Sequence, residues 1–324
     1  MSHEATRQHY VPRTYLQKFA IKRKKNYNIN AIDKNNLEKI IFPNITNVCL
    51  ETDIYTLTGQ TEEQRQALET FYSDNVENVY NEVYQTLTDE SIREINKEMH
   101  YKIVMTIITM MYRTSKWIHL HNDLFDTVLD RMYSLCEQTG KDYFMYEDLR
   151  YSIKGKTLDE IKKEFRKMKK EVQVLTQLKV AFKLINIRKF DGILVSKITS
   201  GNELFTSDNP VVLSNINPGH IAPFDPENMI MLPLDSSHIL TIMPHSQSDG
   251  SHRISRTIES AGMSAAKMIA NNSSQLESSF KYILGTKRAL SNFIEKLEDY
   301  KKPISEVQRK NMEELNEIVR MMIK

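Results

Sequence analysis

The chain has 324 residues, of which 40% are hydrophobic and 27% are charged. Its 44 Lys and Arg residues nearly balance its 42 Asp and Glu residues, so the formal net charge is +2 and any affinity for nucleic acid must come from a local patch. This composition is ordinary for a soluble globular protein and excludes global disorder.

The two cysteines, Cys49 and Cys136, lie far apart in the sequence, which favours a reducing cytoplasm over a disulfide framework. No secretory hydrophobic segment follows Met1. The longest apolar run, residues 103–111, contains two threonines and is shorter than the roughly 20 residues that span a bilayer. We therefore expect a cytoplasmic protein with no membrane partner. The sequence does not indicate an oligomeric state.

Residues 8–19 concentrate imidazole, phenol, guanidinium and ammonium groups in one short segment. Pro12 fixes its own φ and favours extended geometry at Val11, so a strand-like arm is expected over 9–11. After it, apolar and aromatic side chains recur at helical spacing and predict one or two helical turns: Tyr15, Leu16 and Phe19. The segment either presents its polar groups from a rigid platform or forms a buried structural plug.

Alternating apolar residues predict strands at 26–32 and 38–42, which form a hairpin, and a further strand within 48–57. The basic run at 22–25 is interpreted as a solvated turn, with phosphate binding as the alternative. Capping boxes at 61–64 and 157–160 predict helices over about 62–84 and 157–188.

Two more helices are expected over 90–116 and 117–137. Glu69 and Glu77 lie eight residues apart on the first predicted helix, where they are either solvated or jointly hold a divalent cation. Arg113 follows an apolar helix and therefore needs an anion or carbonyl groups as partners. Eight Lys or Arg residues against three acids over 154–170 give a local charge of +5, which indicates a solvated helix face or a surface that follows phosphates.

From Gly192 the pattern changes to short apolar runs, which predict a small antiparallel sheet and one helix at 258–271. The turn at 206–210 ends in Asn209 and Pro210. Three histidines recur every seven residues, which we interpret as coincidence: His238, His245 and His252. The expected fold is a single α+β domain over 1–324. It has a mixed, mostly antiparallel sheet from 1–58 and 190–290, a helical insertion at 61–188 and a C-terminal helix at 303–324.

Two motifs carry a resemblance to a known family. The run at 8–19 resembles the opening signature of a widespread, mainly bacterial family of unknown function, in which His-Tyr-Val-Pro precedes an aromatic residue, a Leu and a Phe. The run at 205–212 is similar to its later Thr-Ser-Asp-x-Pro motif, and 232–234 and Arg113-Thr114 also match. The resemblance spans about 8–290. It implies a setting beside mobile elements and bacterial defence genes, and a nuclease-like role.

If the two sheet portions pair, the opening motif meets the later turn and forms a site for phosphodiester cleavage. His9 is then the general base or acid, Arg13 or Lys18 stabilises charge on the phosphate, and Asp208 orients the imidazole or binds a metal. A divalent metal is an open cofactor requirement. Substrate-binding roles fall to the neighbouring polar residues: Tyr10, Tyr15, Arg113, Ser207 and Asn209.

The first hypothesis is therefore a cytoplasmic nuclease, acting on RNA as a defence or toxin effector. The second is a non-catalytic sensor that binds nucleic acid or another anionic ligand. The third is a folding clamp without a ligand. The sequence contains no phosphate-binding glycine loop, dinucleotide fingerprint, nucleophile elbow or zinc spacing that favours another enzyme class.

Overall fold

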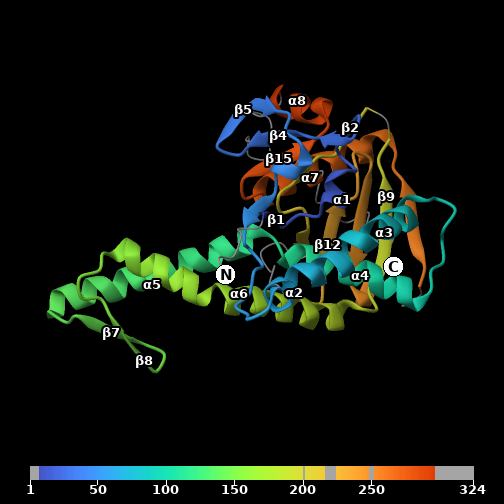
Figure 1. The fold of residues 1–324 in the computed structure, drawn as a ribbon. Helices are drawn as coiled ribbons and strands as arrows, with labels where there is room; N and C mark the ends of the chain where they lie inside the picture. The colour runs from blue at the N-terminus through green and yellow to red at the C-terminus, as the bar shows by residue number, and fades with distance from the viewer. Residues whose placement is uncertain (1–6, 200, 216–223, 248–251, 296–324) are drawn as a thin grey trace.

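Two main sheets and a layer of helices form the body of the protein, and a long helical arm projects from it (Figure 1). The computed structural model describes residues 7–199, 201–215, 224–247 and 252–295. Helices and mostly antiparallel strands alternate irregularly along this part of the chain, which confirms the predicted α+β class. The predicted C-terminal helix at 303–324 lies outside the described residues.

The helices begin and end as follows: α1 (Arg13–Leu16), α2 (Glu62–Tyr72), α3 (Asn78–Thr88), α4 (Lys97–Tyr112), α5 (Ser115–Thr139), α6 (Leu158–Arg188), α7 (Ala261–Ser278) and α8 (Lys287–Glu295). Three short elements complete them: the 3-10 helices η1 (Ile45–Asn47) and η3 (His245–Gln247), and the π-helix η2 (Ser73–Glu77), which joins α2 directly to α3.

The strands of the first half are β1 (Arg7–His9), β2 (Ile21–Arg23), β3 (Asn26–Asn28), β4 (Asn30–Asp33), β5 (Asn36–Ile41), β6 (Leu50–Thr52), β7 (Tyr143–Tyr146) and β8 (Leu149–Ser152). Those of the second half are β9 (Gly192–Lys197), β10 (Thr206–Ser207), β11 (Val212–Asn215), β12 (Asn228–Pro233), β13 (His238–Met243), β14 (Ile254–Ile258) and β15 (Tyr282–Gly285).

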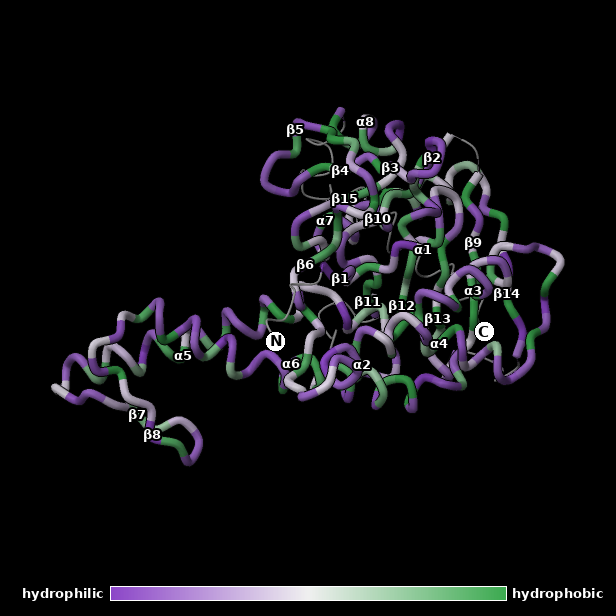
Figure 2. The backbone as a smooth tube through the Cα atoms, in the orientation of Figure 1, coloured by the Kyte–Doolittle hydropathy of each residue, from purple (hydrophilic) through white to green (hydrophobic). Residues whose placement is uncertain are grey.

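The larger sheet has five strands in the order β11-β12-β13-β9-β14, and only the β14–β9 pair is parallel. Hydrophobic residues follow its strands, most clearly along β9 and β12 (Figure 2). Side chains alternate between its two faces: Leu240 and Ile242 join the main core with α4, whereas Ile239 packs with Met268 of α7. The sheet is therefore covered by helices on both faces.

The smaller sheet has four strands in the order β10-β15-β4-β5, and it joins N-terminal strands to strands from the end of the described chain. Strands from 1–58 and 190–290 therefore pair as expected, but the single sheet that the sequence suggested is divided into two main sheets and two two-stranded sheets, β1–β6 and β2–β3. Gly285 explains the close packing at this junction, because a Cβ there would lie 2.9 Å from the Cβ of Phe205. In the basic run at 22–25, Lys22 and Arg23 belong to β2 and Lys24 and Lys25 form the tight turn to β3, and all four are exposed, in agreement with the solvated-turn interpretation.

The predicted helical insertion contains α2 to α6, but it also carries the β7–β8 hairpin at its far end. The second half of α5, this hairpin and the first half of α6 form the arm (Figure 1). A separate hydrophobic cluster fills its tip, around Phe144, Ile161 and Phe165. None of the helices in the described segments combines the length and apolar character needed to cross a membrane.

We expect Phe165→Ala to loosen the arm without loosening the body. Phe165 is 2% exposed and packs against the rings of Phe144, Tyr146 and Tyr151, so its removal leaves a cavity worth about 3 kcal/mol. Hydrogen exchange read by mass spectrometry should accelerate in the arm and stay unchanged in β9, β12 and β13. Met168→Ala, at an exposed position of the same helix, is the control. Equal loss of protection in arm and body would contradict a separate tip core.

Candidate active site

The two sequence motifs meet inside the protein through direct hydrogen bonds. Tyr15 of the opening motif donates its hydroxyl proton to the Pro233 carbonyl at 2.9 Å, and its oxygen lies 2.5 Å from the hydroxyl of Thr206 in the later motif. Thr114, next to Arg113, donates to Oδ1 of Asn209 at 2.8 Å. These contacts are buried, so they fix the arrangement of the motifs but are not themselves open to a substrate.

Arg113 lies at the centre of this arrangement, fully buried behind the C-terminal end of α4. Its Nη2 donates to the carbonyl of His9 at 2.5 Å and lies 3.4 Å from Oε1 of Glu77. The guanidinium stacks over the rings of Tyr72 and Tyr55, at 4.6 and 5.6 Å, and the Tyr55 hydroxyl donates to the Arg113 carbonyl. Its Nε and Nη1 have no hydrogen-bond partner, so a buried cation faces this site with unused donors.

His9 is half-buried beside that guanidinium, and one of its ring nitrogens is committed. Nε2 lies 3.2 Å from the carbonyl oxygen of Ile45. A carbonyl can only accept, so Nε2 carries the proton and Nδ1 is the basic nitrogen. Burial lowers the pKa of His9 to about 4, and the positive charges of Arg13 and Arg113 act in the same direction. The imidazole is therefore neutral at physiological pH.

Glu69 adds an acidic group with the opposite shift. It is half-buried on α2, and its Oε2 has no hydrogen-bond partner. Burial raises the pKa of Glu69, and the neighbouring charge of Glu77 raises it further, while Arg113 and Arg13 oppose the shift. A carboxyl whose pKa is raised and an imidazole whose pKa is lowered thus lie near the same two arginines, which marks them as a candidate acid and base.

The π-helix η2 places the acidic side of this site. Glu77 is the last residue of η2. Glu69 lies on α2, about one turn before η2 begins. Local π-helices are often found at functional sites. The proposed cation site on these two glutamates is disfavoured, because Arg113 occupies the space beside Glu77 and shifts the pKa of Glu69. Within the described segments, no three His, Cys, Asp or Glu side chains are grouped to hold a metal ion.

Asp208 does not make the predicted contact with His9. Its buried carboxylate accepts hydrogen bonds from the backbone N–H groups of Phe280, Lys281 and Tyr282, at 2.8, 2.7 and 3.1 Å. These bonds attach the later motif to the segment between α7 and β15. Asp208 is thus an anchor of the fold, because its acceptor sites are already used within the backbone.

The predicted substrate-binding residues of the motifs are also occupied inside the protein. Ser207 donates to Oε1 of Gln275 at 2.7 Å, and Asn209 donates to the carbonyl of Ser278 at 3.2 Å. Both partners belong to α7, so these polar side chains attach that helix to the turn. All five predicted binding residues are buried, in contacts or in the core: Tyr10, Tyr15, Arg113, Ser207 and Asn209.

Lys18 belongs to a second polar cluster that the sequence did not reveal. Its Nζ donates to Oδ1 of Asn81 at 2.8 Å and lies 4.3 Å from the ring centre of Tyr84. The Tyr84 hydroxyl donates to Asp235 at 2.7 Å, and Asp235 also holds Nδ1 of His238 at 2.9 Å. Although burial opposes ionisation, the bonds from His238 and Tyr84 hold the pKa of Asp235 at about 2. The sequence signal for this cluster was Asp235 and His238, an acid and a histidine three residues apart where β12 turns into β13.

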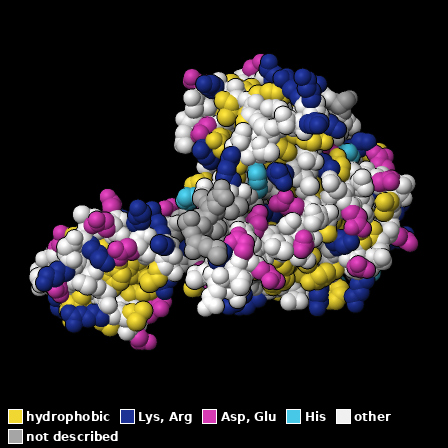
Figure 3. Space-filling view, viewed as in Figure 1, with side chains coloured by type: hydrophobic (Ala, Val, Ile, Leu, Met, Phe, Trp, Pro, Cys, Tyr) yellow, Lys and Arg dark blue, Asp and Glu magenta, His cyan; other side chains and the backbone are white. Residues whose placement is uncertain are grey.

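Half of the basic side chains in the segment at 154–170 form ion pairs. Lys162 pairs with Asp130 at 2.5 Å, Lys169 pairs with Glu147 at 3.0 Å, and Arg166 also pairs with an acid on α5. Basic and acidic side chains are interspersed over the arm in Figure 3. The solvated-face interpretation therefore fits this segment better than a phosphate-binding surface.

Comparison with family models matches residues 7–320 to a family described as Protein of unknown function (DUF4238). The match extends beyond the stretch of about 8–290 over which the two motifs and their neighbours carry the resemblance. Searches of curated proteins and of solved structures each returned no significant match. The comparisons therefore identify a family and leave its chemistry to be inferred from the site.

We expect His9 to titrate far below an ordinary histidine. Between pH 6.5 and about 4 the unfolded chain binds a proton at this position that the folded chain does not, so folding stability contributed by His9 falls as the pH falls through this range. Titration of the imidazole resonances by NMR should give a midpoint near 4, with His9→Gln used to assign the signal. A midpoint of 6 or above would contradict the buried, neutral imidazole.

Replacement of Asp208 should destabilise the fold. Asp208→Ala leaves three backbone N–H groups without their acceptor, at a cost of about 3 kcal/mol in the free energy of unfolding. Urea denaturation measures the change. Asp123→Ala, at an exposed position on α5, is the matched control and should change stability by less than about 0.5 kcal/mol. Equal stability of both variants would contradict the anchoring role.

Proposed function

We propose, starting from the fact that this chain belongs to the DUF4238 family of proteins of unknown function, that it is a nuclease whose acid–base site is centred on His9. One observation carries the proposal. The Ile45 carbonyl fixes the imidazole as the tautomer that leaves Nδ1 basic, and burial keeps it neutral. A neutral base among Arg7, Arg13 and Arg113 suits a substrate with a negatively charged phosphate.

We assign the following roles to the residues in RNA cleavage. Nδ1 of His9 accepts the proton of the ribose 2′-hydroxyl, whose oxygen attacks the neighbouring phosphorus. The bond from phosphorus to the 5′-oxygen breaks, and Glu69, in the carboxylic acid form that burial favours by raising its pKa, supplies the proton that this leaving oxygen needs. The products are a 2′,3′-cyclic phosphate and a 5′-hydroxyl, so protons and bonds balance. His9 and Glu69 are the catalytic residues of this proposal.

The arginines have two different roles in this scheme. Arg13 is exposed on α1 and is available to hold a phosphate oxygen. Arg113 is buried and bonds to the His9 carbonyl, so it positions the base and contributes positive charge from behind. A divalent ion would coordinate the phosphate and water. The assay is therefore run both with a chelator and with added metal.

The proposed setting is that of a toxin or anti-phage defence effector, as the resemblance of the two motifs suggests. Expression of such a nuclease should slow the growth of a bacterial host, and the effect should depend on the same residues as RNA cleavage. The second candidate is a sensor, in which the same arginines bind an anionic ligand and no reaction is catalysed.

The test is cleavage of end-labelled RNA and DNA oligonucleotides by the purified protein, in EDTA and with Mg²⁺ or Mn²⁺. His9→Gln keeps an N–H donor for Ile45 but removes the base, so the cleavage rate should fall about 100-fold or more. Arg13→Ala should lower it about 10-fold. Lys18→Ala is the matched control, because Lys18 lies in the cluster with Asn81 and Tyr84, and its rate should change less than 3-fold.

A folded His9→Gln variant that cleaves as fast as the natural chain would overturn the assignment. Absence of cleavage by the natural chain, together with protection of the oligonucleotide that Arg13→Ala abolishes, would instead establish the sensor.

A further inference from the structure

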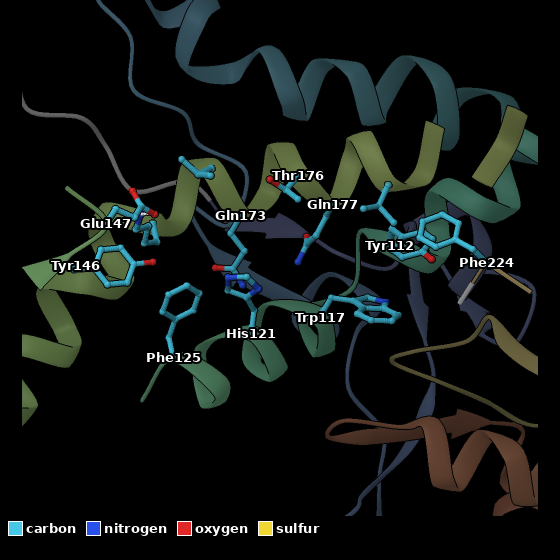
Figure 4. A pocket seen from close by; sticks show the side chains of 13 residues that line it. Tyr112, Trp117, His121, Phe125, Tyr146, Glu147, Gln173, Thr176, Gln177 and Phe224 are labelled. Atoms are coloured by element: carbon cyan, nitrogen blue, oxygen red, sulfur yellow. Dashed lines mark hydrogen bonds and ion pairs between the residues drawn. The ribbon is translucent and has the colours of Figure 1, made fainter. Parts of the chain in front are cut away.

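A groove of about 390 Å³ runs between α5 and α6 where the arm leaves the body. Side chains from α5 form one side and side chains from α6 form the other, and Tyr112 and Phe224 close one end (Figure 4). The volume lies in the range of small-molecule sites. No residue of the His9 site lines it, so the groove is a separate feature.

Aromatic rings form much of its wall, and their contacts hold them in place. Trp117 stacks on Tyr112, with ring centres 5.3 Å apart, and its indole N–H donates to the Met111 carbonyl at 2.9 Å. At the other end Phe125 lies 6.1 Å from the ring centre of Tyr146. Figure 4 shows the two groups of rings at opposite ends of the groove, with His121, Gln173 and Gln177 in the portion between them. A flat ring entering this portion meets aromatic surfaces that are already ordered.

Two polar side chains line the same space, Tyr112 and Gln177. Tyr112 is 4% exposed, and its hydroxyl is buried without a hydrogen-bond partner. Such an unmet group destabilises the folded protein, and a ligand with a matching donor or acceptor would recover that cost. The amide of Gln177 points between the two groups of rings (Figure 4), whereas the amide of Gln173 is committed to the Ile118 carbonyl.

The groove offers little to a charged group. Lys169 is the cation on its wall, but it pairs with Glu147 at 3.0 Å and lies over the ring of Tyr146. A purely aliphatic ligand would leave the Tyr112 hydroxyl unmet. The combination of aromatic walls with a hydroxyl and an amide fits a flat, uncharged ring that carries hydrogen-bonding groups on its edge.

We propose that this groove binds a purine or pyrimidine base, stacked against the aromatic walls and hydrogen-bonded along its edge by Tyr112 and Gln177. The sugar and phosphate remain in solvent outside the groove. The base belongs either to a free nucleotide or to single-stranded nucleic acid, since both present the same ring. Tyr112 and Arg113 are consecutive residues, so the groove and the His9 site share the end of α4. The proposal is independent of catalysis at His9.

The chain carries its own reporter, because Trp117 is its single tryptophan and lines the groove. Fluorescence of the full chain, excited at the red edge of indole absorption, is titrated with each of the four nucleoside monophosphates and with a single-stranded oligonucleotide. Ribose 5-phosphate, which lacks the base, is the control ligand. We expect saturable quenching by at least one base-containing ligand and none by ribose 5-phosphate. Response to the oligonucleotide alone would assign the base to a nucleic-acid strand, and response to monophosphates would assign it to a free nucleotide.

Two variants test whether the ligand binds in the groove or elsewhere on the surface. Tyr112→Phe removes only the unmet hydroxyl and should weaken binding about 5- to 10-fold. Phe125→Ala removes a stacking wall and should weaken it at least 10-fold. Phe190→Ala, an exposed aromatic outside the groove, is the matched control and should leave affinity unchanged. No saturable response to any base, an equal response to ribose 5-phosphate, or equal affinity of Phe125→Ala and Phe190→Ala would each overturn the proposal.

Discussion

The fold of the N-terminal half depends on the need to satisfy one buried guanidinium. Arg113 is fully buried, and a charge in that position is tolerated only when it is paired and hydrogen-bonded. The chain meets this requirement in part, with a carbonyl from β1, a carboxylate from η2 and the rings of Tyr55 and Tyr72, while Nε and Nη1 remain without a hydrogen-bond partner. Segments that are distant in the sequence are thereby fixed around a single side chain. The same contacts determine where the backbone of His9 lies.

Features that depend on nearby residues were predictable from the sequence. The capping boxes at Thr61 and Thr157 are both formed, and each begins a helix where expected. The hairpin of β4 and β5 and the short helix after Pro12 also follow from local patterns. The α+β class followed from the change of pattern near Gly192. The division into two sheets did not, because strand pairing is decided by non-local packing.

The candidate site shows the same limit. The sequence singled out His9, Arg13 and Arg113 individually because each lies at or beside a motif, and in the structure both arginines lie close enough to lower the pKa of His9. It could not show that the acceptor sites of Asp208 are used by three backbone N–H groups, or that Lys18 points to Asn81. Those partners come from segments more than 60 residues away. A residue type indicates what chemistry is available, whereas the topology determines which partner it meets.

The π-helix between α2 and α3 has a consequence for how this family can vary. A π-helical turn holds one residue more than an α-helical turn, so it changes the rotational phase between the two helices by about 100°. Glu69 precedes this turn and Glu77 ends it, and both face Arg113 in the present phase. Loss of a single residue from Ser73–Glu77 would restore a regular helix and turn one glutamate away from the arginine. The length of this segment, independently of its composition, thus sets the alignment of the acidic groups.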